Sequence, residues 1–223
     1  MRYYLLGISL AVLATLQQRN ALADEGASFD CAKASTAVEQ TICDDAYSML
    51  MDREISRQFS ALRSKHPGVV DAQKNWLKQR DRCQDDRVCL WTALARRWVA
   101  LGRQIEEDLG VPELSGVYDY VVRPEEIVGD LTLAAGPRGD YGFYISTVTL
   151  RHGHLCEVMG ANASRAGAGE VSWPIPETDR TMTLTPGDGG VVTLAIEYDD
   201  ERSFCGARAY FSGPYRFTPN GEN

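Results

Sequence analysis

Cysteine usage constrains this chain more than any other feature of its sequence. The chain has six cysteines, and all of them follow an N-terminal segment with the features of an export signal. Arg2 gives a positive start, residues 5–16 form an apolar run too short to span a bilayer, and Ala21-Leu22-Ala23 fits a signal-peptidase site. We therefore expect residues 1–23 to be a signal peptide. No second apolar run of membrane length follows, so the mature protein is expected to be soluble and periplasmic or secreted.

An even number of cysteines in an oxidising compartment predicts disulfide bonds. Their spacing favours three local pairs, which are Cys31 with Cys43, Cys83 with Cys89, and Cys156 with Cys205. The competing interpretation is a zinc site. The chain has no C-x-x-C pair and only three histidines, so we expect neither a metal nor a cofactor.

The first part of the chain has helical periodicity. Thr36-x-x-Glu39 is a capping-box signature and predicts a short helix. Apolar residues at helical spacing predict further helices over residues 45–65 and 70–82, and a last helix with a tryptophan-rich stripe. That stripe is expected to lie in the core and consists of Trp91, Leu94, Trp98, Leu101 and Ile105. The sequence thus predicts a small, disulfide-stapled α-helical domain within residues 24–110.

Beyond Gly110 the chain changes to short β-rich runs separated by glycine, proline and acidic residues. The expected strands are residues 116–122, 130–134, 142–150, 155–160, 181–185, 191–198, 207–211 and 213–217. Residues 161–176 are expected to form a surface loop. Short strands with many turns predict a small antiparallel β barrel or sandwich over residues 111–223, and hence an α+β protein.

The sequence carries few signs of catalysis. It contains no G-x-S-x-G elbow, no H-E-x-x-H motif and no phosphate-binding loop of the usual spacing. One local cluster remains, in which His152 and His154 could share a metal with Glu157. A hairpin turn at Gly153 with two exposed histidines is the favoured alternative, because no further ligands are close in sequence. We therefore expect a binding protein rather than an enzyme. A hydrolase of the envelope that uses these histidines is kept as a third hypothesis, after the two binding functions given at the end of this section.

A specific pattern runs through the helical part. It consists of Cys31-Ala32-Lys33-Ala34, Val38-Glu39-x-x-Ile42-Cys43, Asp52-x-x-Ile55-x-x-x-Phe59, Gln73-x-x-Trp76-Leu77-x-x-Arg80-x-x-Cys83, and Cys89-Leu90 with Arg97 and Leu101. With these residues, the segment from about Phe29 to Leu109 resembles the N-terminal domain of the lysozyme inhibitor LprI family, small exported proteins of bacteria. Phe59 and Leu94 stand where tyrosine is common, which removes a hydroxyl and keeps an apolar group. The resemblance implies a disulfide-stapled helical domain and, for some members, inhibition of lysozyme.

The pattern leaves two interpretations of its central residues. Gln73, Trp76 and Arg80 share one helical face. We expect Trp76 to pack in the core with Arg80 at its edge, reaching an acid such as Asp44 or Asp52. The alternative is a surface recognition patch, since exposed tryptophan and arginine are frequent hot spots of binding.

The β-rich part matches the family only weakly. Ser212-Gly213-x-Tyr215 is similar to the Ser-Gly-x-Tyr loop of β-barrel lysozyme inhibitors. The segment Ser115-Gly116-Val117-Tyr118 matches that loop equally well. A glycine turn between two closing strands is the competing and favoured interpretation of the motif.

The helical and β-rich parts of the chain differ in net charge. The formal net charge of -8 argues against a nucleic-acid partner, which requires a basic surface. Residues 24–110 hold 13 basic and 15 acidic side chains, whereas residues 111–223 hold 8 and 16 and no lysine. A basic partner is therefore expected to bind the β-rich part. The candidate partner-binding residues are the acidic turn Asp199-Asp200-Glu201 together with Ser212 and Tyr215.

Two functional hypotheses follow from the sequence. The first is an exported envelope protein that binds and blocks a lysozyme-like muramidase, with acidic turns that raise the association rate. The second is an envelope binding or assembly module that holds a protein or cell-wall ligand and inhibits nothing.

Overall fold

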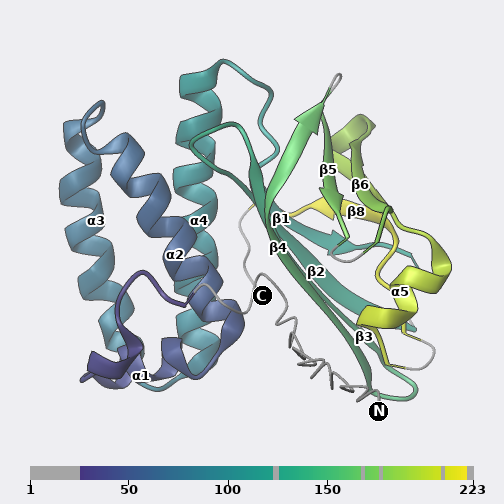
Figure 1. The fold of residues 1–223 in the computed structure, drawn as a ribbon, viewed down its shortest axis with the longest axis horizontal. Helices are drawn as coiled ribbons and strands as arrows, with labels where there is room; N and C mark the ends of the chain where they lie inside the picture. The colour runs from purple at the N-terminus through teal and green to yellow at the C-terminus, as the bar shows by residue number, and fades with distance from the viewer. Residues whose placement is uncertain (1–25, 123–125, 167–168, 176–177, 207–208, 220–223) are drawn as a thin grey trace, which may run out of the picture.

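The computed structural model places a group of helices beside a closed β barrel (Figure 1). It describes residues 26–122, 126–166, 169–175, 178–206 and 209–219, so the expected signal peptide at residues 1–23 lies outside the described residues. The helical part comprises η1 (Cys31–Lys33), α1 (Ala37–Cys43), α2 (Ala46–Leu62), α3 (Pro67–Arg80), η2 (Asp81–Cys83) and α4 (Arg87–Leu109). The expected α+β class is confirmed, and the β part is a barrel rather than a sandwich.

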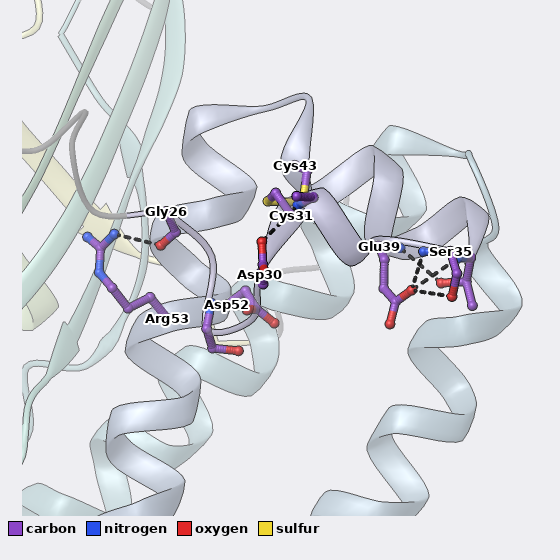
Figure 2. Close-up of a disulfide and its surroundings, with 11 residues drawn as sticks. Gly26, Asp30, Cys31, Ser35, Glu39, Cys43, Asp52 and Arg53 are labelled. Atoms are coloured by element: carbon purple, nitrogen blue, oxygen red, sulfur yellow. Dashed lines mark hydrogen bonds between the residues drawn. A yellow bond between two sulfur atoms is a disulfide. The ribbon is translucent and has the colours of Figure 1, made fainter.

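The first helix begins with the expected capping box. The Glu39 amide donates to Thr36 Oγ1 at 3.2 Å, and the Thr36 amide donates to Glu39 Oε2 at 3.0 Å. Backbone hydrogen bonds from Ser35 and Thr36 lower the pKa of Glu39 to about 2. Figure 2 shows the hydrogen bonds around Glu39, and also the Cys31–Cys43 disulfide, which joins η1 to the end of α1.

Removing the cap is expected to have a moderate effect on stability. Thr36→Ala leaves the Glu39 amide without its acceptor, so the free energy of unfolding should fall by about 1 kcal/mol. Urea unfolding followed by far-UV circular dichroism measures this change. Ser60→Ala, at an exposed position inside α2, is the control and should change stability by less than about 0.5 kcal/mol. Equal effects of the two substitutions would contradict the capping role.

All three expected disulfides are present. Besides Cys31–Cys43, Cys83 pairs with Cys89 across the turn into α4, and Cys156 pairs with Cys205. No cysteine is free, and all six lie within the described residues. The spacing argument is therefore confirmed.

The longest helix, α4, supports both halves of the molecule. Its side chains at Leu94, Trp98, Leu101 and Ile105 are buried, as the stripe predicts, whereas Trp91 is only half-buried. The helix packs against α2 and against the barrel, and the buried residues of helices and barrel form one continuous core. The two parts therefore meet through a shared apolar core.

Polar contacts reinforce this junction. Arg57 of α2 forms an ion pair with Asp140 at 2.8 Å, and the Gln58 amide donates to the Ala135 carbonyl at 2.7 Å. The buried Glu106 carboxylate on α4 accepts the Tyr141 hydroxyl at 2.7 Å and backbone amides just before the first strand. The expected boundary between residues 24–110 and 111–223 coincides with the change from helix to strand, and the division into two domains stays a prediction.

The barrel is a simple meander. Its strands are β1 (Gly116–Tyr120), β2 (Ile127–Ala135), β3 (Tyr141–Thr149), β4 (His154–Ala166), β5 (Glu170–Pro174), β6 (Thr181–Pro186), β7 (Val191–Ala195) and β8 (Gly213–Phe217). Each strand pairs antiparallel with the next, and β8 pairs with β1 to close the barrel. A short helix, α5 (Tyr198–Phe204), separates β7 from β8.

Two expectations about the strands are wrong. The expected loop at residues 161–176 is wrong for residues 161–166 and 170–174, which belong to β4 and β5, while residues 167–168 and 176 are outside the described residues. Small buried alanines at 161 and 163 hide the alternation that would have indicated a strand there. The expected strand at 207–211 is also wrong for residues 209–211, which lie outside any strand, while residues 207–208 are outside the described residues.

Candidate binding site

A cleft lies where the helices meet the outer face of the barrel. Its volume is about 290 Å³, and its walls come from α2, α4 and the first three strands. The lining residues are Tyr47, Trp91, Thr92, Ala95, Arg96, Val117, Asp119, Asp130, Thr132, Tyr144, Ser146 and Thr218. This volume is near the lower end for ligand pockets, so the cleft fits a side chain or another small group.

The inside of the barrel offers much less space. A pocket bounded by Phe143, Trp173 and neighbouring apolar residues measures about 10 Å³. That is about the space one water molecule requires. The barrel interior is a packed core, and the cleft on its outer face is the better candidate for binding.

Three aromatic rings form one wall of the cleft. The Tyr47 and Tyr144 rings are stacked with centroids 3.5 Å apart, and the Trp91 ring is tilted against Tyr47 at 6.0 Å. The Trp91 indole donates to Asp45 Oδ2 at 2.9 Å and to Ser48 Oγ at 3.1 Å. These contacts fix the rings in place, so the wall is formed before any ligand binds.

Two carboxylates lie side by side in the same cleft. Asp119 on β1 is the direct cross-strand partner of Asp130 on β2. Burial, and then the charge of Asp119, raise the pKa of Asp130 to about 6. Asp119 accepts a hydrogen bond from Thr218 Oγ1 at 2.7 Å. Within the described residues, neither carboxylate forms an ion pair, although Arg96 lines the same cleft and Arg216 is the cross-strand neighbour of Asp119.

The acid pair begins a longer row across the outer face of the barrel. In cross-strand register, Asp130 lies opposite Ser146, and Ser146 lies opposite Glu157 on β4. We call Asp119, Asp130, Ser146 and Glu157 the acidic row. The Glu157 carboxylate is exposed and accepts the Tyr144 hydroxyl at 2.8 Å. The row therefore runs from inside the cleft to the open surface.

A second row on this face is apolar. Val128 lies opposite Val148, and Val148 lies opposite Leu155. Val128 and Leu155 expose 43% and 44% of their surface, which is unusual for large apolar residues. We call these three residues the apolar row. An exposed apolar strip beside an acidic strip is typical of a protein-binding surface.

The residues expected to bind a partner lie elsewhere. Glu201 is in α5 rather than in a turn, is only 3% exposed, and accepts the backbone amides of Phe211 and Ser212 at 2.6 Å each. Tyr215 is fully buried, and its hydroxyl donates to the Phe211 carbonyl. The expectation of an exposed acidic turn is therefore wrong for Glu201. Its carboxylate instead holds the segment before β8.

For Asp199, Asp200 and Ser212, the structure neither supports nor contradicts a partner-binding role. Asp199 and Asp200 lie in α5, and their side chains are outside the described set. Ser212 is half-buried, and its hydroxyl donates to Glu201 Oε2 at 3.1 Å. A partner-binding role for these three residues stays a prediction.

The histidine cluster is not assembled as a metal site. His154 and Glu157 are three residues apart on a strand, so their side chains point to opposite faces of β4. Glu157 is turned toward Tyr144, and the His152 and His154 rings lie 5.6 Å apart. Within the described residues, no three His, Cys, Asp or Glu side chains gather closely enough to hold a metal ion.

The central residues of the helical pattern have structural contacts. The Arg80 guanidinium lies 3.7 Å from Asp52 and over the Trp76 ring at 5.3 Å, as expected. The Trp76 indole donates to the Ala93 carbonyl at 3.1 Å, although its ring is only half-buried. These contacts join α3 to α2 and α4 and favour the structural interpretation.

Comparison with known proteins finds a partial similarity. An 81-residue stretch is 33% identical to proteins of Mycobacterium bovis and Mycobacterium tuberculosis, each named lipoprotein LprI. Part of this chain is similar to LprI. The match covers 34% of this chain and 41% of the LprI sequences, so the chain spans well under half the length of these relatives. No family model matches the chain. No solved structure matches it either.

The residues of the cleft were missed at the sequence level. Trp91 was assigned to the core, and neither Asp119 nor Asp130 stands in a recognisable motif. Their proximity depends on the register between β1 and β2, which no local pattern reveals. One sequence signal could have located Asp119. It stands between two tyrosines, Tyr118 and Tyr120, that are buried in the structure, so the alternation along a strand places Asp119 on the outer face.

Proposed function

We propose that this protein is a bacterial envelope protein that binds a basic, lysozyme-like muramidase and inhibits it without catalytic activity of its own. The similarity to lipoprotein LprI, which covers 34% of the chain, supports an LprI-like envelope protein. The resemblance of the helical part to a family with lysozyme-inhibiting members supports a lysozyme-like muramidase as the partner. The observation that carries the proposal is the acidic row beside the apolar row on the outer face of the barrel.

The chemistry of this face suits a basic protein. The acidic row would attract positive charge over distance and raise the association rate more than the final affinity. The apolar row would supply the water-excluding contact that retains the partner once it has docked. Acidic residues exceed basic residues by two to one over residues 111–223, which extends the same electrostatic preference to the whole barrel sequence.

Three disulfides support a location outside the cytoplasm, where oxidising conditions maintain them. The signal-like sequence at residues 1–23 supports the same location. The relatives are named lipoproteins, and the six cysteines of the present sequence are all paired in disulfides. Among the described helices, none combines the length and apolar character needed to cross a membrane.

A lysozyme titration tests the proposal. The mature protein at micromolar excess over a basic lysozyme is expected to suppress cell-wall hydrolysis at low salt. The inhibition should weaken at high salt, because the Debye length falls from about 10 Å at 0.1 M to about 3 Å at 1 M. Unchanged lysozyme turnover at low salt would contradict the proposal.

The cleft favours a second candidate function, a module that holds an envelope protein or a cell-wall fragment without inhibiting a muramidase. Its aromatic wall and polar floor could accept a small group from such a ligand. Pull-down from envelope extract distinguishes the two functions. Recovery of one non-lysozyme partner, with no effect on lysozyme turnover, would favour this second function.

A further inference from the structure

We propose that the cleft is a guanidinium-binding pocket, which takes the side chain of an arginine presented by a basic protein partner. The identity of that partner rests on the proposed function, whereas the chemistry of the pocket rests on the cleft itself. Three features carry the inference: a concave site between helices and barrel, two adjacent carboxylates on its floor, and an aromatic wall beside them.

Neither carboxylate forms an ion pair with another of the described residues. Asp119 and Asp130 are both withdrawn in part from solvent, and they repel each other across one cross-strand step. Burial is the first cause of the raised pKa of Asp130, and the charge of Asp119 is the second. A bound cation would offset the repulsion between the carboxylates, and its hydrogen bonds would partly replace the water that burial removes. The arrangement is costly for the free protein and favourable for a cationic ligand.

The geometry favours a guanidinium over an ammonium group. A guanidinium is planar and has five N–H donors, so one group can bridge two carboxylates and reach nearby hydroxyls such as Thr132 and Ser146. Its flat face also stacks on aromatic rings, and Trp91 and Tyr47 line the same cleft. An ammonium group has only three donors and no flat face, so it would use fewer of these partners.

Charged and titratable groups surround the acid pair on every side. Tyr47 faces it from α2 and Tyr144 from β3, and burial raises the pKa of both hydroxyls, so both stay neutral. Arg96 lines the cleft from α4 with its side chain exposed, and Arg216 on β8 is the cross-strand neighbour of Asp119. Both arginines therefore bring positive charge close to the acid pair.

The position of the cleft agrees with its proposed occupant. The acidic row leads from Glu157 on the open surface to Asp130 inside the cleft. A basic protein that docks on this surface would therefore bring its own side chains to the mouth of the cleft. A single arginine entering there would act as an anchor in the way that buried arginines do at protein interfaces.

Two small probes test the pocket without any partner. N-acetyl-arginine amide and N-acetyl-citrulline amide have nearly the same shape, but only the first is charged. We expect the arginine probe to shift the Trp91 indole resonance in an NMR titration and to bind at least tenfold more tightly than the citrulline probe. Equal binding of the two probes, or no shift with either, would overturn the inference.

A double variant locates the binding. Asp119→Asn with Asp130→Asn keeps the shape of both side chains, and it should weaken binding of the arginine probe at least tenfold. The matched control is Asp188→Asn, an exposed acid on η3 (Asp188–Gly190) between β6 and β7, which should leave binding within twofold. Urea unfolding of each variant shows that it is folded. Unchanged probe binding in the double variant would also overturn the inference.

The outcomes separate this inference from the proposed function. If the arginine probe binds and lysozyme does not, the pocket stands and the proposed partner is wrong. If lysozyme binds the double variant as tightly as it binds the original protein, the proposed function stands, but lysozyme does not place an arginine in the pocket.

Discussion

Replacing Gly102 with leucine is expected to lower the free energy of unfolding by more than about 3 kcal/mol. Gly102 lies on the face of α4 that presses against the barrel. A Cβ atom at this position would lie 2.7 Å from Ser115 Oγ and 2.8 Å from the backbone nitrogen of Ala135. Backbone atoms of a strand cannot move aside as a flexible side chain does, so helix and barrel would be forced apart. Urea denaturation measures the loss.

Gly68→Ala is the matched control for this change. Gly68 lies in the first turn of α3, and a Cβ atom added there would meet nothing within 4 Å. Alanine is the better helix former, so the control should be neutral or more stable by up to about 1 kcal/mol. A Gly102→Leu protein as stable as the control would show that α4 and β2 are not packed as described.

Replacing Asp130 with asparagine is expected to make the protein more stable at pH 8 by about 3 kcal/mol, and no more stable at pH 4. The raised pKa of about 6 lies about two units above the ordinary value of 3.8, and each unit is worth about 1.4 kcal/mol. Between about pH 3.8 and pH 6, the Asp130 carboxyl group keeps its proton in the folded protein, whereas the unfolded chain has released it. The stability linked to that proton is therefore lost as the pH rises through about 6.

Urea unfolding of both proteins at pH 4, 6 and 8 measures this difference. Asp188→Asn is the control, because Asp188 is exposed and should behave alike at all three pH values. A stabilising effect of Asp130→Asn at pH 4 that equals the effect at pH 8 would contradict the assignment. A loss of stability at pH 8 would show that the charged carboxylate has a partner that supports the fold.

The helical part of the fold is well predicted by the sequence because its signals are local. The Thr36 capping box and the stripe on α4 depend on residues three or four positions apart, and the Cys31–Cys43 and Cys83–Cys89 pairs are 12 and 6 residues apart. Such features need no knowledge of the tertiary fold.

The barrel was predicted less completely because long-range contacts decide its details. Small buried alanines in β4 gave no alternating signal, and β5 was missed with them. The segment before β8 resembled a strand, but the buried Glu201 carboxylate binds the amides of Phe211 and Ser212 that a strand would donate to its neighbour. A glutamate ten residues away in sequence therefore replaces strand pairing there.

The candidate site was beyond prediction for the same reason. Asp119 and Asp130 become neighbours only through strand register, and the helices that wall the cleft come from the other half of the chain. Charge counting did place the acidity in residues 111–223. It favoured the acidic residues around Glu201 as the binding surface, whereas we propose the outer face of β1 to β4.

A matched pair of charge reversals tests the central claim, that a basic muramidase binds this face. Glu157→Lys and Asp188→Lys make the same change in net charge, but only Glu157 belongs to the acidic row. The dissociation constant for lysozyme, measured at low salt by isothermal titration calorimetry, should rise at least tenfold for Glu157→Lys and less than twofold for Asp188→Lys. Equal changes for the two variants, or no lysozyme binding by the unaltered protein, would contradict the account.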